Sequence, residues 1–293
     1  MHQALGMNPR VSVVVPTCGR PALLARCLDA LERQTLPRAE YEVIVIEDQR
    51  RDGPASARNR GWRKARAPIV AFTDDDCVPA PDWLERALAA FREGADVVCG
   101  RIVMPAPARP TDYERDAQGL ERSEFVTANC LCRRSWLERV DGFDEAFKLA
   151  WREDSDLHFR LLRHGARIVR EPRAVVVHPV RPARWGVSVS QQRKVMFDAL
   201  LFKKHPRLYR ERIRAQARWD YYAIVASLLA APLFPPVLVV WAALTARFAW
   251  QRLRGTTRTP SHVLEMVLTS MAIPPLAVFW RALGALKYRV AFV

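Results

Sequence analysis

The sequence predicts an α/β fold, with a mainly parallel sheet covered by helices on both faces, followed by membrane-associated C-terminal helices. Short β-branched runs alternate with helical stretches between residues 11 and 178, which is typical of βαβ units. A basic segment and then two long apolar blocks follow. We therefore expect a domain at 8–180, a basic amphipathic juxtamembrane segment at 181–220 and two hydrophobic membrane segments within 221–293.

Five runs are predicted to be the strands of the sheet. They are VSVVVP (11–16), YEVIVIED (41–48), IVAFTD (69–74), ADVVCGRIV (95–103) and AVVVHP (174–179). Apolar residues at helical spacing lie between them. Because sheets of this kind bind ligands beyond the carboxyl ends of their strands, we expect residues 17–20, 47–52 and 74–76 to line one edge.

Net charge limits the classes of binding partner that the sequence predicts, and cysteine spacing indicates the redox state of its thiols. A formal charge of +15 implies affinity for polyanions: nucleic acid, anionic lipid or a phosphate-bearing substrate. Most of the excess lies beside the apolar blocks, which favours anionic membrane lipids over nucleic acid.

The six scattered cysteines include no Cys-x-x-Cys pair, so we interpret them as reduced thiols in a cytoplasmic domain. The N-terminus has no pattern typical of a cleaved signal peptide.

The two apolar blocks, Tyr221 to Ala246 and Val263 to Ala285, resemble each other. PPVLVVWAALTA (235–246) aligns with PPLAVFWRALGA (274–285), as in a small internal repeat. The Pro-Pro pair lies mid-block, which leaves halves of about eleven residues where a spanning helix needs roughly twenty. The linker between the two blocks and the segments that flank them on the outside are all basic. Two spans would place the linker on the opposite side of the membrane from the outer segments, against the tendency of basic residues to lie on the cytoplasmic side. We favour two re-entrant hairpins, with two Pro-kinked spans as the alternative.

Three adjacent carboxylates, Asp74, Asp75 and Asp76, directly follow a predicted buried strand. In an arbitrary loop they would be a solvated acidic turn, but here the sheet would fix them at the ligand-binding edge. Asp74 and Asp76 are two apart and can approach one site. Mg²⁺ or Mn²⁺ prefers such oxygens, and a cation bridging a diphosphate would neutralise its departing charge.

The ordered motifs resemble a family 2 glycosyltransferase with the GT-A fold, a Rossmann-like nucleotide-diphospho-sugar transferase fold, over about Val11 to Pro179. VSVVVPTCGRP (11–21), VIVIED (43–48) and ASARNRGW (55–62) resemble the family's first strand, second strand and supporting helix. The resemblance implies that the nucleotide sugar is bound by Pro16, Thr17, Arg20, Asp48, Arg58, Asn59, Asp74 and Asp75. It also implies a metal site of Asp74, Asp76 and His178, although a lone histidine after a strand is usually structural.

Two later motifs resemble the acceptor side and the catalytic base. TANCLCRRSWLERVDGFDE (127–145) resembles the stretch ending in Gly-Gly-Phe-Asp-Glu, with Asp141 in place of the first glycine, which implies donor and acceptor roles for Asn129 and Gly142. WREDSDLHFRL (151–161) resembles the Glu-Asp-x-Asp-Leu helix start, which implies that Asp154 is the general base, with Glu153 on the acceptor side as the second candidate. Acids in the first turn of a helix also stabilise its dipole.

The resemblance implies an inverting, metal-assisted transfer of one sugar from a nucleotide-diphosphate sugar, most simply a UDP-sugar, to a lipid-linked or saccharide acceptor. We expect the protein at the cell inner membrane, with its catalytic domain in the cytoplasm. Two alternatives are a non-catalytic, membrane-anchored nucleotide-sugar-binding protein and a processive polysaccharide synthase. Such synthases carry Gln-x-x-Arg-Trp, whereas Gln191-Gln192-Arg193-Lys194 lacks the tryptophan, which favours single-sugar transfer.

Overall fold

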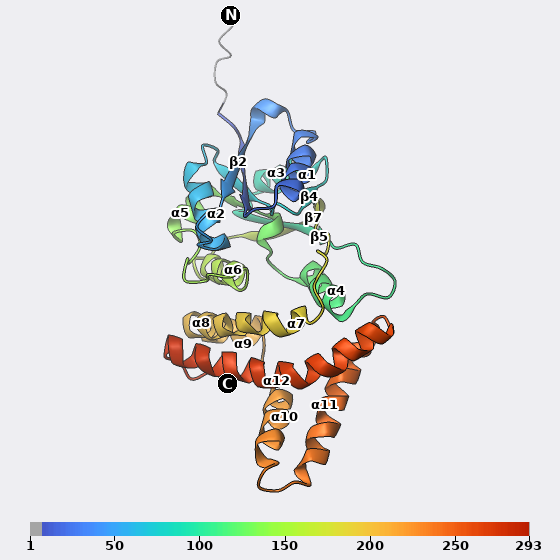
Figure 1. The fold of residues 1–293 in the computed structure, drawn as a ribbon. Helices are drawn as coiled ribbons and strands as arrows, with labels where there is room; N and C mark the ends of the chain where they lie inside the picture. The colour runs from blue at the N-terminus through green and yellow to red at the C-terminus, as the bar shows by residue number, and fades with distance from the viewer. Residues whose placement is uncertain (1–7, 293) are drawn as a thin grey trace, which may run out of the picture. The chain divides into compact units, whose positions relative to one another are not determined.

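Seven strands form one sheet in the computed structural model, which describes residues 8–292 (Figure 1). Their order is β2-β1-β3-β6-β5-β7-β4. The strands are β1 (Val11–Thr17), β2 (Tyr41–Glu47), β3 (Ile69–Phe72), β4 (Val78–Pro79), β5 (Val97–Val103), β6 (Cys130–Arg133) and β7 (Ile168–Val177).

The sheet is mainly parallel by strand direction. β1 pairs in parallel with β2 and β3, and β5 with β7, whereas β6 runs antiparallel to both β3 and β5. The two-residue β4 is antiparallel to β7. The five strands that share one direction correspond to the five runs predicted from the sequence, and the two that oppose them, β4 and β6, were not predicted.

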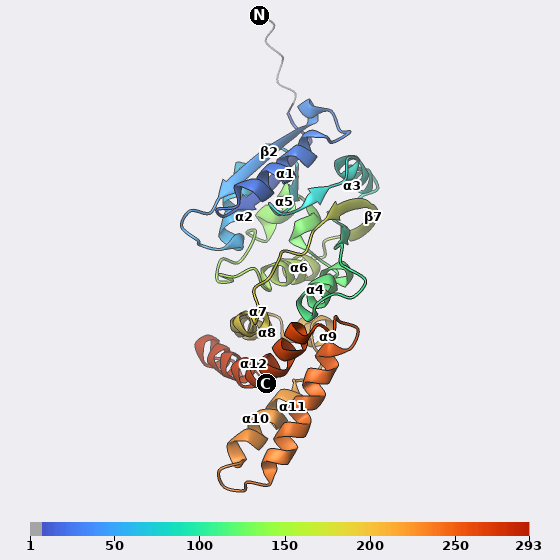
Figure 2. The same ribbon diagram turned by 45° about the vertical axis from the view of Figure 1, so that its right-hand side comes forward.

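Helices cover both faces of the sheet, as expected for the α/β class. The helices of this part are α1 (Pro21–Glu32), α2 (Pro54–Lys64), α3 (Trp83–Arg92), α5 (Arg134–Arg139) and α6 (Glu153–Arg163). α1 and α3 lie on one face, and α6 lies on the other (Figure 2). Leu137 of α5 and Leu157 of α6 share a buried core with Val14 and Phe72 of the sheet.

Gly61 lets α2 approach the sheet closely. A Cβ at this position would lie 2.2 Å from Cγ1 of Val14 in β1, a distance that non-bonded carbon atoms do not reach. α2 begins with Pro54, whose fixed φ suits the first helical position. The helix is therefore held directly over β1 and β2, with Arg58 and Asn59 on it.

The chain divides into two compact units. The first holds residues 8–105 and 119–179, and the second holds residues 106–118 and 180–292. The segment 106–118, which includes α4 (Asp112–Ala117), leaves the sheet after β5 and belongs to the second unit. The sequence analysis expected this segment within the domain at 8–180, so the structure differs there.

The second unit is helical and contains both apolar blocks. Its helices after residue 180 are α7 (Val187–Ser190), α8 (Met196–Lys204), α9 (Pro206–Arg212), α10 (Trp219–Ala230), α11 (Val237–Leu253) and α12 (Pro260–Tyr288). α10 and α11 pack together as a helical hairpin, and Pro235 and Pro236 lie in the loop between them.

The second Pro-Pro pair behaves differently from the first. Pro274 and Pro275 lie inside α12, which continues through them as one helix. The chain does not turn back here, contrary to the second hairpin favoured from the sequence. α12 packs against α8, α10 and α11, and contacts with neighbouring helices stabilise a helix despite the hydrogen bonds that proline removes.

Within residues 8–292, one helix is long and apolar enough to cross a membrane. It is α12, whose most apolar 18-residue window has a mean hydropathy of 1.6. A third of that window, 33%, is buried inside the protein. A core helix can have the same length and composition, so this observation alone is weak evidence for a span.

Candidate active site

The end of β1 is joined to the acids that follow β3. Thr17 Oγ1 donates a hydrogen bond of 2.6 Å to Asp75 Oδ2, and Arg20 Nη2 lies 3.0 Å from Asp75 Oδ1. Asp75 is fully buried, and this burial raises the pKa of its carboxyl group. Pro16, also predicted to bind the nucleotide, lies in the buried strand β1. Asp75 therefore connects the loop after β3 to the end of β1.

Asp76 lies beside His178, which follows β7. The Nε2 atom of His178 is 3.7 Å from Asp76 Oδ1. Potential metal-binding atoms of Asp76, Cys77 and His178 all lie within 4.8 Å of one another. The buried Nδ1 of His178 has no hydrogen-bond partner among the described residues. This carboxylate, imidazole and thiol set fits a divalent cation, and it suits the more nitrogen- and sulfur-tolerant Mn²⁺ better than Mg²⁺.

Asp74, the third predicted metal ligand, is held by a different partner. Its Oδ1 accepts a 2.7 Å hydrogen bond from Nη2 of Arg58, whose Nη1 donates at 2.9 Å to Glu153 Oε1. Burial opposes ionisation of Asp74, but Arg58 together with His178 and Arg20 outweighs it and lowers the pKa of Asp74. One buried guanidinium therefore links the acid after β3 to the acid that opens α6, although 95 residues separate Arg58 from Glu153.

Replacing Arg58 with methionine should destabilise the protein strongly. The side chain of Arg58 is 4% exposed, and its loss would leave two carboxylates without their cation. Removing one partner of a buried ion pair typically costs about 3–5 kcal/mol. The midpoint of urea unfolding, followed by circular dichroism, measures this effect.

Arg33→Met is the matched control. Arg33 and its partner Asp29 are both 60% exposed, and exposed pairs contribute only about 0–1 kcal/mol. Equal midpoints for the two variants would contradict a central role of Arg58 in holding the site together.

The two acids at the start of α6 have different surroundings. Glu153 is buried against Arg58, whereas Asp154 is half-buried. Asp154 Oδ1 accepts hydrogen bonds from the backbone nitrogen (2.6 Å) and the hydroxyl (3.3 Å) of Ser155. Burial raises the pKa of both acids, and burial together with the charge of Asp154 raises that of Glu153 to about 7. Of the two, Asp154 is the one that solvent or substrate can reach.

The raised pKa of Glu153 predicts a pH-dependent stability. The pKa of Glu153 is raised to about 7 in the folded protein, whereas in the unfolded chain it has the ordinary value of 4.5. Folding therefore binds a proton between these values, and stability falls as the pH rises from 4.5 to 7. Glu153→Gln, which cannot ionise, should flatten this part of a plot of thermal midpoint against pH. An unchanged slope would show that another group causes it.

Asp48 closes the turn between β2 and α2. It accepts hydrogen bonds from the backbone nitrogens of Asp52 (3.2 Å) and Gly53 (3.0 Å) and from Arg60 Nη2 (3.0 Å). Burial opposes ionisation, but these contacts together lower the pKa of Asp48. The carboxylate lies beyond the end of β2, as expected.

Asn59 and Gly142 come together from distant parts of the chain. Asn59 Nδ2 donates to the carbonyl of Phe143, and Asn59 Oδ1 accepts from the Phe143 nitrogen, each at 2.8 Å. Gly142 has φ of +59°, and a Cβ there would lie 2.4 Å from Asn59 Oδ1. The amide thus holds the turn after α5.

Asn129 is buried in the short 3-10 turn just before β6, and both ends of its amide are occupied. Its Nδ2 donates to the carbonyls of Arg101 (3.0 Å) and Ala174 (2.9 Å), and its Oδ1 accepts from Trp83 Nε1 (2.8 Å). These contacts join it to β5, β7 and α3. Its hydrogen-bond partners are thus backbone carbonyls and an indole, not the acids described above.

Cys77 is the residue that the sequence analysis overlooked. Its thiol lies with Asp76 and His178, and burial together with the neighbouring acids raises its pKa well above the ordinary value. The signal was its position directly after Asp76. A single cysteine among six scattered ones gave no spacing that would have distinguished it.

A known sequence family matches much of the first unit. Residues 12–53 and 48–147 match the family described as glycosyl transferase family 2, and residues 117–179 match the N-terminal domain of galactosyltransferase. The two matches overlap and together extend from β1 to the end of β7.

Several named relatives are glycosyltransferases. Glycosyltransferase AglE of Haloferax volcanii is 25% identical over 72% of this chain and 80% of its own length. Validoxylamine A glucosyltransferase of Streptomyces hygroscopicus is 27% identical over 72% of this chain, and pre-mycofactocin glycosyltransferase of Mycobacterium tuberculosis is 35% identical over 49%. The matches span 64% and 33% of those two relatives, less than two thirds of each.

Solved structures share the fold. A mannosyltransferase from Pyrobaculum calidifontis, in complex with GDP-Man and Mn²⁺, has a TM-score of 0.55 at 21% identity, covering 97% of this chain and 88% of its own. TarS from S. aureus in complex with UDP-GlcNAc has a TM-score of 0.52 at 16% identity, covering 93% of this chain and 92% of its own. These similarities confirm the GT-A fold expected from the sequence.

Proposed function

The chain belongs to glycosyltransferase family 2, and on this basis we propose that it moves one sugar from a nucleotide-diphosphate sugar to an acceptor hydroxyl with inversion. The observation that supports this most directly is the connection of the β3 acids to the α6 acids through Arg58. This connection supports the proposal because Arg58 joins the proposed diphosphate-binding edge to the helix start that carries the proposed base. A protein that only bound the nucleotide sugar would have no use for the acids of α6.

Asp154 acts as the general base in this proposal. The acceptor oxygen attacks the anomeric carbon as its proton passes to the carboxylate of Asp154, and the bond from that carbon to the diphosphate oxygen breaks. Attack opposite the leaving group inverts the anomeric centre. Glu153 suits this role less well, because it is buried and hydrogen-bonded to Arg58.

The donor site is assigned to the residues that follow β3 and β7. Asp76 and His178 would hold Mg²⁺ or Mn²⁺, with Cys77 beside them, whereas Asp74 is bound to Arg58. When bound, the cation neutralises charge on the departing nucleoside diphosphate. Arg20 lies within 3.7 Å of Asp76 and is placed to contact the diphosphate. The ligands of the two solved relatives, GDP-Man with Mn²⁺ and UDP-GlcNAc, support a nucleotide-sugar donor, and we favour a UDP-sugar.

A donor panel tests the proposed activity before the acceptor is known. The purified protein is incubated with UDP-, GDP- and TDP-sugars and Mn²⁺ or Mg²⁺, and release of the nucleoside diphosphate is measured. We expect slow hydrolysis of one donor, because water can replace the acceptor, and loss of this activity in EDTA. Hydrolysis that is equally fast in EDTA would contradict the metal assistance, and binding of a donor without any turnover would support the non-catalytic alternative.

The α10–α11 hairpin supports attachment to the inner membrane from the cytoplasmic side. At 1.5 Å per residue, α10 is about 18 Å long and α11 about 26 Å, whereas the hydrocarbon core is about 30 Å thick. The tip exposes Leu233 and Phe234, with Leu233 91% exposed. We propose that this tip enters one leaflet and that arginines at the opposite end of the hairpin, Arg218 before α10 and Arg254 after α11, bind anionic headgroups. This places the transferase beside a lipid-linked or saccharide acceptor.

Leu233→Asp should weaken binding to vesicles that contain phosphatidylglycerol. Transfer of a leucine side chain from water contributes about 1.5–3 kcal/mol, so we expect about a tenfold or greater loss in a co-sedimentation assay. Ala146→Asp, at an exposed site in the first unit, adds the same charge and should have little effect. Equal losses for both variants would contradict insertion of the tip. Duplex DNA should not compete with the vesicles.

A further inference from the structure

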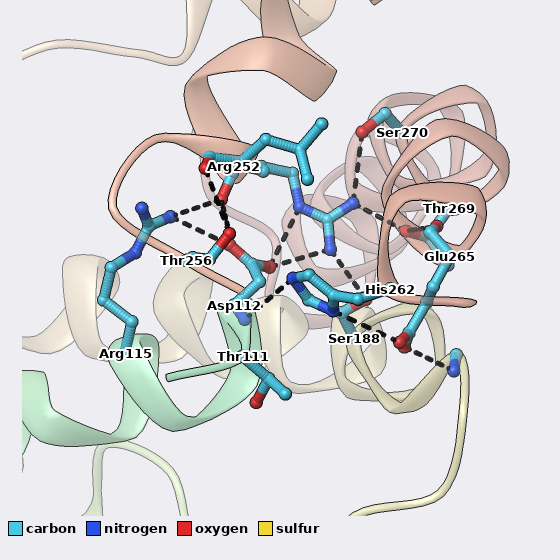
Figure 3. A network of polar contacts seen from close by, with 12 residues as sticks. Thr111, Asp112, Arg115, Ser188, Arg252, Thr256, His262, Glu265, Thr269 and Ser270 are labelled. Carbon is cyan, nitrogen blue, oxygen red and sulfur yellow. Dashed lines mark hydrogen bonds and ion pairs between the residues drawn. The ribbon is translucent and has the colours of Figure 1, made fainter. Parts of the chain in front are cut away.

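The second unit contains a cavity that the proposed transfer reaction does not use. It has a volume of about 400 Å³, within the range of about 300–1,000 Å³ for small-molecule sites. Its walls come from α4, from residues 180–188, from the end of α11 and from the first turns of α12 (Figure 3). All of these belong to the second unit. The cavity is therefore formed without any residue of the candidate active site.

The wall carries balanced charge. Three arginines and three carboxylates line it: Arg181, Arg184, Arg252, Asp112, Glu114 and Glu265. Arg252 is already fully engaged, because Asp112, Thr269, Ser270 and Ser188 accept from its guanidinium. An anionic ligand would meet as many carboxylates as arginines and would gain little net electrostatic attraction from the lining of the cavity. A neutral ligand with many hydroxyl groups can use donors and acceptors of both kinds.

His262 and Glu265 provide a matched donor and acceptor in this wall. His262 is 5% exposed, and its Nε2 accepts from the Asp112 backbone nitrogen at 3.4 Å, which assigns the ring proton to Nδ1. That Nδ1 has no hydrogen-bond partner among the described residues, and Glu265 Oε2 lies 3.8 Å away, too far for a direct bond. The other Glu265 oxygen accepts from the Gly186 nitrogen at 2.7 Å. A ligand hydroxyl could accept from His262 and donate to Glu265.

Trp185 completes the site with an aromatic surface. It lines the cavity and is 53% exposed, although a tryptophan side chain is costly to leave in water. The negative face of its ring attracts the C–H groups on the apolar face of a sugar ring. We propose that this cavity binds a neutral saccharide. The cavity shares no lining residue with the donor site, and the proposal goes beyond the proposed transfer.

The test measures saccharide binding to the full chain in a sugar-free detergent, with EDTA and without any nucleotide sugar. Methyl glycosides of glucose, galactose, mannose and N-acetylglucosamine, and their disaccharides, are titrated by saturation-transfer difference NMR. Inorganic phosphate serves as the anionic probe. We expect at least one saccharide to bind with Kd on the order of 1 mM, typical of weak polar ligands, and phosphate not to displace it.

Two variants and a matched control locate the binding. Trp185→Ala should raise Kd about tenfold or more, equivalent to about 1.4 kcal/mol. Glu265→Gln should also raise Kd, although its amide oxygen can keep the Gly186 hydrogen bond. Trp250→Ala removes a tryptophan that is 57% exposed in the same unit but outside the cavity, and it should leave Kd unchanged. No saccharide binding, displacement by phosphate, or equal effects of the two tryptophan variants would each overturn the proposal. Donor hydrolysis is measured separately, so failure here does not bear on the transferase.

Discussion

Asp76→Ala is expected to abolish sugar transfer and to remove the dependence of nucleotide binding on Mn²⁺. Asp76 supplies the carboxylate of the group formed with Cys77 and His178. A cation that neutralises developing charge contributes several kcal/mol, so we expect a loss of about 10³-fold or more in turnover. Calorimetric titration with the nucleoside diphosphate, in Mn²⁺ and in EDTA, measures the binding effect.

Asp29→Ala is the control for this variant, because Asp29 is a 60% exposed acid on α1 and should transfer at the normal rate. Asp74→Ala provides a second comparison. Asp74 is bound to Arg58, so its loss should weaken the site without removing the metal dependence completely. If Asp74→Ala instead abolishes metal-dependent binding and Asp76→Ala does not, the cation lies on the Arg58 side of the site.

Asp154→Asn is expected to abolish transfer while donor binding is retained. The amide has nearly the same shape and can still accept the hydrogen bond from the Ser155 nitrogen, but it cannot take a proton. A positioned base typically contributes about 10²–10⁴-fold, and we expect a loss of that size in turnover. The donor affinity should change by less than about twofold, since the effect lies in the transition state.

Glu153→Gln distinguishes the two acids of α6. Glutamine can still accept from Arg58, so this variant should keep much of the transfer activity. Near-normal transfer by Asp154→Asn together with a large loss in Glu153→Gln would assign the proton transfer to Glu153. Thermal midpoints of both variants, measured in parallel, separate loss of the base from loss of the fold.

The five parallel strands were predictable because each is a run of β-branched residues bounded by turns. β6 (Cys130–Arg133) was missed because its sequence, CLCR, has no β-branched residue. It forms a strand by pairing with β3 and β5, which are distant in sequence. β4 is shorter still. Local patterns carry little information about strands whose stability comes mainly from their partners.

The sequence motifs named candidate site residues but did not predict the contacts that those residues make. The acids after β3 and at the start of α6 were identified from motifs, but the motifs gave no indication that Arg58 would hold Asp74 beside Glu153. Asn59 and Asn129 were expected near ligands, whereas their amides bond to backbone and tryptophan groups of the protein. Such pairings depend on tertiary packing across tens of residues.

The segment 106–118 makes the two units inseparable by a single cut. The segment follows β5 in the sequence but belongs to the second unit. Its Asp112 pairs with Arg252, 140 positions later. A recombinant fragment that stops at residue 180 keeps Asp112 but discards its cation. Exchange of the helical unit between related enzymes therefore has to transplant two pieces of sequence together, and a graft of the C-terminal piece alone would pair a foreign helix bundle with the wrong insert.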